Sequence, residues 1–156
     1  TWRSFQCMGN YEMLYLHGTN MDVLGNTGII DAMSRMRTDS IHGIRWIGTS
    51  ISQEGTLEEA IQNRCLDWVD SVQLPGRVFL DRPDLMKILR YEGKFIVANS
   101  PIKKDGRNRK PDDIYKELLS HIECNIILTG TRHHLEDTLG MTIKLGPTKD
   151  VEDGDQ

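Results

Sequence analysis

Polar and small residues follow two short apolar runs of this sequence, at the point where each run stops. Residues 13–16, MLYL, are followed by HGTN at residues 17–20, and residues 125–128, NIIL, are followed by TGTR. Parallel α/β proteins carry their chemistry at the carboxyl ends of their strands, so both places are candidate sites. A histidine such as His17 can transfer protons at such a position, although a lone histidine after a buried strand is often structural.

Five strand–helix units are expected to position these groups. Strands are predicted at residues 11–16, 44–47, 70–74, 94–98 and 124–128. Helices are predicted at residues 29–36, from Thr56 with Glu59 as its capping partner, from a start at Asp81, Arg82 and Pro83 to Gly93, from Pro111, and at residues 133–139. Residues 22–28 are expected to form a loop, and residues 77–80 either extend a strand or form a loop.

Length, charge and composition restrict the class of protein. The chain has 156 residues, which predicts one domain over residues 1–146 followed by an acidic flexible tail over residues 147–156. Its net charge of −4 predicts that it does not bind nucleic acid or anionic membranes. No apolar run is long enough to span a membrane and no signal peptide is apparent, so a cytoplasmic protein is expected. The three cysteines have no C-x-x-C spacing, so we expect buried reduced thiols at Cys65 and Cys124, and no metal site.

Five segments together resemble one known family. They are LYLHGTN at residues 14–20, IHGIRWIGTSISQEGTLEEAI at 41–61, DSVQLPGRVFLDRPDLMKILRYEG at 70–93, KFIVANSPIKKDG at 94–106 and NIILTGTRHHLEDTLG at 125–140. In this order and spacing they resemble strands four to eight of the aldo-keto reductases. The resemblance implies a partial (β/α)8 TIM-barrel-like fold of about five parallel βα units, in which strands one to three are missing.

The resemblance also implies which catalytic groups are present. Aldo-keto reductases reduce carbonyls with NADP(H) and a tetrad of Asp, Tyr, Lys and His. The first three belong to the missing strands, and only the histidine carries over, onto His17. The resemblance therefore implies a protein without reductase activity on its own.

Cofactor-binding positions carry over unevenly. By resemblance, Ser50 and Gln73 hold the nicotinamide amide of NADP(H). Ser100 and Ile102 belong to the segment that meets the pyrophosphate, and Gly130, Thr131 and Arg132 lie where the family holds the 2′-phosphate. Ile51 and Thr138 replace two asparagines of the family pattern, which argues for weakened cofactor binding.

Three functions stay open at this point. The first is a truncated aldo-keto-reductase-like protein with a binding, structural or vestigial role, and the second is a carbonyl oxidoreductase completed by a companion chain or a missing N-terminal segment. The third is a nucleotide- or anion-binding module, for which the basic loop at residues 103–110 could grip phosphate or simply be solvated. Five parallel strands have two apolar edges, at residues 13–16 and 125–128, which predict self-association unless residues 1–10 cover one of them.

Overall fold

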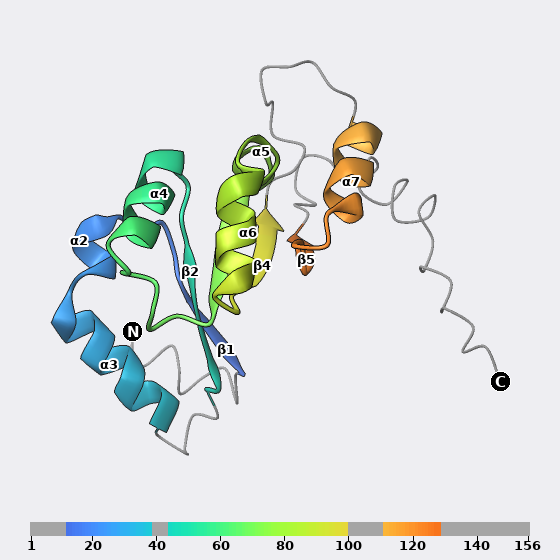
Figure 1. Cartoon of the computed structure of the whole chain (residues 1–156). Coiled ribbons are helices and arrows are strands. Elements are labelled where there is room, and N and C mark those ends of the chain that lie inside the picture. Colours follow the sequence, from blue (N-terminus) through green and yellow to red (C-terminus); the bar gives the residue numbers. More distant parts are fainter. Residues whose placement is uncertain (1–11, 39–43, 100–110, 129–156) are drawn as a thin grey trace, which may run out of the picture.

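The sheet and its helices are described for residues 12–38, 44–99 and 111–128 of the computed structural model (Figure 1). The strands are β1 Met13–Leu16, β2 Trp46–Ser50, β3 Ser71–Pro75, β4 Phe95–Asn99 and β5 Ile126–Leu128. The helices are α2 Met21–Leu24, α3 Thr27–Thr38, α4 Glu54–Gln62, α5 Gly76–Asp81, α6 Pro83–Tyr91 and α7 Pro111–Ser120.

All five strands are parallel, and they lie in the sheet in chain order, β1-β2-β3-β4-β5. Helices connect the successive strands, so the predicted parallel α/β class with five strands is confirmed. Strands β1 and β5 are the two edges of the described sheet, as expected from the sequence. The structure does not establish a closed barrel.

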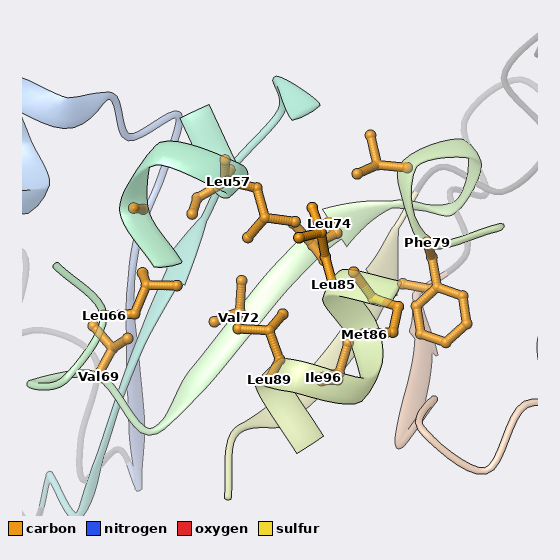
Figure 2. Close-up of a cluster of buried hydrophobic side chains, with 14 of the residues drawn as sticks. Leu57, Leu66, Val69, Val72, Leu74, Phe79, Leu85, Met86, Leu89 and Ile96 are labelled. Atoms are coloured by element: carbon orange, nitrogen blue, oxygen red, sulfur yellow. The ribbon is translucent and has the colours of Figure 1, made fainter. Parts of the chain in front are cut away.

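One hydrophobic core lies between the helices and one face of the sheet. Every described helix contributes to it, and Figure 2 shows Leu85, Met86 and Leu89 of α6 among the strand residues Val72 and Ile96. The strand residues in or against this core alternate along their strands: Leu14, Leu16, Ile47, Val72, Leu74, Ile96, Ala98 and Ile127. Because successive side chains of a strand point to opposite faces, the intervening residues form a second face of the sheet.

We call this second face the helix-free face, because the described helices form their core on the other side of the sheet. It consists of Met13, Tyr15, Trp46, Gly48, Ser50, Ser71, Gln73, Pro75, Phe95, Val97, Asn99, Ile126 and Leu128. None of these thirteen side chains is a carboxylate, an ammonium, a guanidinium or an imidazole.

The first two helices differ from the expectation. Residues 22–28 are not all loop, because α2 forms at Met21–Leu24 with Asn20 as its N-cap, and the Asn20 Oδ1 atom accepts a hydrogen bond from the Val23 N–H at 3.1 Å. Helix α3 is longer than predicted, and the Asn26 Oδ1 atom accepts from the Ile29 N–H at 3.1 Å near its start. Both asparagines satisfy N–H groups that a helix start leaves unpaired.

The start and end of α4 also differ from the prediction. The helix begins at Glu54 with Gln53 as its N-cap, so the capping-box assignment of Thr56 was wrong, because Thr56 lies inside the first turn. The helix ends at Gln62, so Cys65 lies in the following turn and not on a helix face. Cys65 and Cys124 are free thiols and only partly buried, which corrects the expectation of full burial.

Residues 77–80 form neither a strand extension nor a loop, because α5 occupies Gly76–Asp81 directly after β3. Its Val78 and Phe79 side chains are buried in the core. Helix α6 begins at Pro83 with Arg82 as its N-cap, so the predicted start is confirmed for these two residues, whereas Asp81 belongs to α5. Gly93 follows the end of α6 at a φ of +74°, which a glycine adopts without strain. The start of α7 at Pro111 is also confirmed.

Strand boundaries shift by up to three residues from the prediction, and the edge strands are less buried than expected. Residues 13–16 are half-buried, not buried on both faces, because β1 is an edge strand of the described sheet. In β5, Ile126 and Leu128 are exposed.

Arg82 joins α4 to the start of α6. Its guanidinium donates to Glu54 at 2.8 Å, to Glu58 at 3.3 Å and to Asp84 at 2.8 Å. The hydrogen bonds to Arg82 hold the pKa of Asp84 below its ordinary value.

Several predicted features lie outside the described residues. They are the helix at 133–139, the tail at 147–156, the basic loop at 103–110, the segment 1–10, Thr138, and the candidate cofactor residues Ser100, Ile102, Gly130, Thr131 and Arg132.

Candidate functional site

The carboxyl ends of β1, β2 and β3 bring three of the predicted site residues to one end of the sheet. His17 follows Leu16, which lies opposite Thr49, so His17 stands level with Ser50. Ser50 in turn lies directly opposite Gln73. Cα atoms on neighbouring strands are about 4.8 Å apart, so the Ser50 hydroxyl and the Gln73 amide can reach one ligand group together.

The loop after β1 is fixed to the end of β2. Gly18 turns the chain at a φ of +63°, in the left-handed region that favours glycine. The Thr19 N–H donates to the Ser50 carbonyl at 3.0 Å, and the Thr19 hydroxyl donates to the same oxygen at 3.1 Å. The Thr49 Oγ1 atom lies 2.7 Å from Thr19 Oγ1. These bonds hold His17, which is exposed to solvent, beside the Ser50 end of β2.

Ile51 does not face the same way as Ser50. Its N–H donates to the Gln73 carbonyl at 3.0 Å, which extends the pairing of β2 with β3 by one residue. Its side chain is 1% exposed and belongs to the core on the helix side of the sheet. The structure therefore gives Ile51 a packing role, which the sequence comparison with the family pattern did not indicate.

The Ser50 hydroxyl and the Gln73 amide are available to hydrogen-bond a ligand. Within the part of the chain that the structure describes, neither side chain forms a hydrogen bond with another residue. An amide and a hydroxyl that lie side by side at strand ends suit a neutral polar ligand group such as a carboxamide.

Tyr15 is a residue of the helix-free face that the site prediction missed. Its ring lies over Gly48, and its hydroxyl contacts the Ser71 Oγ atom, which donates to the Phe95 carbonyl at 2.8 Å. Burial raises the pKa of the Tyr15 phenol above its ordinary value, and the hydrogen bond with Ser71 opposes that shift. The alternation of residues 13–16 together with Gly48 on the next strand was the available signal for this packing.

The amino ends of the strands form a second feature, a hollow of about 500 Å³. Trp46 and Phe95 line it, together with the charged residues Asp70 and Lys94. The Lys94 ammonium is buried and donates to the Leu66 carbonyl at 2.7 Å and the Val69 carbonyl at 2.8 Å.

Asp70 has a structural role as well. One of its carboxylate oxygens accepts from the Ile47 N–H at 2.8 Å and pairs with the Arg37 guanidinium. Asp70 and Lys94 thus hold together the segments that lead into β2, β3 and β4. No role was predicted for them from the sequence.

No group of three or more His, Cys, Asp or Glu side chains that could hold a metal ion occurs among residues 12–38, 44–99 and 111–128. Within those ranges, no helix has the length and apolar character needed to cross a membrane.

Comparisons with known proteins give no assignment. No protein-family model matches the sequence, and no curated protein matches it.

Proposed function

We propose that this chain is an aldo-keto-reductase-like partial barrel, equivalent to strands four to eight, and that it has a binding or structural role without reductase activity of its own. The observation that carries the proposal is the pairing of Ser50, the last residue of β2, with Gln73 of β3 in a parallel sheet whose strands follow chain order. These are two positions that the resemblance assigns to the cofactor amide.

The strand order supports a barrel-type arrangement over the other parallel architecture. Doubly wound sheets reverse their strand order and carry helices on both faces. Here the order never reverses, and one core lies between all described helices and one face of the sheet. A (β/α)8 barrel has this arrangement, with its helices outside and its second face turned toward the barrel interior.

Reductase chemistry lacks its proton donor in the described part of the chain. Carbonyl reduction needs a group that protonates the developing oxyanion within hydrogen-bond reach. The Tyr15 hydroxyl is bonded to Ser71 at the amino-terminal end of β3, two residues before Gln73. Lys94 precedes β4 and is bonded to carbonyl oxygens at the amino end of the sheet.

NADP(H) is the cofactor that the resemblance implies, and we expect the isolated chain to bind it weakly. Ser50 and Gln73 can hold a carboxamide, but Ile51 contributes no polar side chain at the place where the family pattern has asparagine. Each ligand group left without its hydrogen bond costs about 1–3 kcal/mol.

Calorimetric titration of the purified chain with NADPH tests this part of the proposal. We expect binding weaker than micromolar. Micromolar or tighter binding that is lost in Gln73→Ala, and kept in the surface variant Glu59→Gln, would overturn it.

The open sheet edges favour a second candidate function. Within the described sheet, strands β1 and β5 each have a strand neighbour on one side only, and a closed eight-stranded barrel would need three further strands between them. A companion chain or an N-terminal segment that supplied these strands would give an NADP(H)-dependent carbonyl oxidoreductase.

Adding a fragment with the first three βα units of an aldo-keto reductase tests this candidate. NADPH-dependent aldehyde reduction that requires both the fragment and His17 would support it. No turnover in the mixture, with complex formation shown by sedimentation, would contradict it.

A further inference from the structure

We propose that the hollow at the amino ends of the strands is a binding site for a carbohydrate, a neutral ligand whose ring carries several hydroxyl groups. The proposal rests on the side chains that line the hollow, and it does not depend on the proposed relationship to aldo-keto reductases or on NADP(H). The volume of the hollow, about 500 Å³, lies within the range of small-molecule sites, which is about 300–1,000 Å³.

Three polar side chains of the hollow are fixed by the fold itself. The Asp70 carboxylate accepts from the Ile47 N–H at 2.8 Å, and the Asn125 Oδ1 atom accepts from the Ile96 N–H at 2.8 Å. The Lys94 ammonium donates to two carbonyl oxygens of the segment that precedes β3. Because these bonds tie the beginnings of neighbouring strands together, the hollow is preorganised, and preorganisation lowers the entropic cost of binding.

Two exposed aromatic rings give the hollow an apolar wall. Trp46 begins β2 and Phe95 begins β4, and their side chains are 50% and 37% exposed. Both rings line the hollow. A sugar ring has a face of C–H groups that can pack on an aromatic ring while its hydroxyls point away from it. A sugar stacked on either ring therefore removes apolar surface from water and keeps its hydroxyls free to hydrogen-bond.

Charged groups of both signs stand beside the rings. Three carboxylates and two cationic side chains line the hollow, so a ligand with a net charge of either sign meets groups of its own sign. Two of these groups, Arg90 and Glu92, lie at the end of α6. Within the part of the chain that the structure describes, neither of these two side chains forms a hydrogen bond or an ion pair.

The free side chains of Arg90 and Glu92 favour hydroxyl groups as ligands. The Arg90 guanidinium can only donate hydrogen bonds, and the Glu92 carboxylate can only accept them. A hydroxyl group does both, so neighbouring hydroxyls of one neutral ring can satisfy the donor and the acceptor together. A sugar thus matches the apolar wall, the free donor and the free acceptor at once, which neither a purely apolar ligand nor a simple ion does.

Titration of the isotope-labelled chain with D-glucose, D-galactose, D-mannose and N-acetyl-D-glucosamine, one at a time, tests the proposal. With at least one sugar, heteronuclear NMR spectra should show a saturable shift of the Trp46 indole N–H and of the Glu92 backbone N–H. We expect a Kd in the millimolar range, because a monosaccharide makes few contacts. Trp46→Ala and Glu92→Gln should each raise the Kd about tenfold or more, since they remove the stacking ring and the charged acceptor.

Tyr91→Ala and Glu59→Gln are the matched controls. Tyr91 is an aromatic residue of α6 that is 94% exposed, and neither Tyr91 nor Glu59 lines the hollow. Both control variants should bind the sugar as the wild type does. The spectra also show whether each variant is folded, and if Trp46→Ala is not, Glu92→Gln decides, because it keeps the shape of the side chain.

Three results would overturn the proposal. The first is the absence of a saturable shift at the hollow with all four sugars, and the second is an equal loss of affinity in Trp46→Ala and Tyr91→Ala, or in Glu92→Gln and Glu59→Gln. The third concerns L-phenylalanine as an additional probe. Binding of L-phenylalanine at the hollow, with no sugar bound, would assign the site to a zwitterionic ligand.

Discussion

Gly48 is the position where the packing of the helix-free face can be tested most sharply. A Cβ atom added there would lie 2.4 Å from the Tyr15 Cε1 atom and 2.6 Å from Cδ1 and Cζ. Carbon atoms in contact are about 3.5–4.0 Å apart, so the ring has to move by about 1 Å or more. The Tyr15 hydroxyl is tied to Ser71, so this movement also disturbs that hydrogen bond.

Gly48→Ala should lower the free energy of unfolding by about 1–3 kcal/mol. Overpacking of a close contact costs roughly 1–3 kcal/mol, and a disturbed hydrogen bond about 1 kcal/mol, while the loss of glycine's backbone entropy returns about 0.5–1 kcal/mol. Urea denaturation followed by circular dichroism measures the change. Gly55→Ala is the control, because its added Cβ would meet nothing within 4 Å, and it should leave stability unchanged or slightly raised.

A double-mutant cycle assigns the effect to the ring. In a Tyr15→Ala background, the further change Gly48→Ala should be nearly neutral, which gives a coupling free energy of about 1–3 kcal/mol. A loss below about 0.5 kcal/mol in Gly48→Ala, or the same loss with and without the tyrosine, would refute the packing of Tyr15 over Gly48.

Two further predictions concern charged groups. Lys94→Met leaves two buried carbonyl oxygens without a partner and should cost roughly 2–4 kcal/mol in urea denaturation, whereas Lys87→Met on the exposed side of α6 should cost almost nothing. The pKa of Asp84 is lowered in the folded state, so its ion pair with Arg82 stabilises the fold above the unfolded pKa of about 4. This stabilisation is lost as the pH falls below that value. Arg82→Gln removes it and should make the free energy of unfolding less sensitive to acid. An unchanged acid profile in Arg82→Gln would contradict this coupling.

Much of the fold followed from the sequence, because apolar runs and glycine or proline boundaries mark parallel strands and their helices. The five strands, their parallel direction and the start of α6 at Pro83 agree with the structure. The missed helix α2 depends on the side chain of one residue, Asn20, and α5 follows β3 with no loop between them. Such junctions depend on capping bonds and core contacts that periodicity does not reveal.

The positions of the candidate site residues could be predicted from the sequence only as far as the strand register could be. Ser50 and Gln73 were expected at strand ends, and the pairing of β2 with β3 places them opposite each other. Sequence could not indicate that Ile51, the next residue, turns to the core, because a shift of one residue exchanges the two faces of a strand. The role of Lys94 was also hidden, because its partners are carbonyl groups of the loop before β3.

Aldehyde reduction by the purified chain, followed as the loss of NADPH absorbance, tests the central claim most directly. The account predicts no rate above that of the protein-free mixture, because the described residues bring neither a tyrosine hydroxyl nor a lysine ammonium to the His17 end of the sheet. Turnover that disappears in His17→Ala, and persists in the surface variant Glu59→Gln, would contradict the account and show that the chain is a reductase by itself.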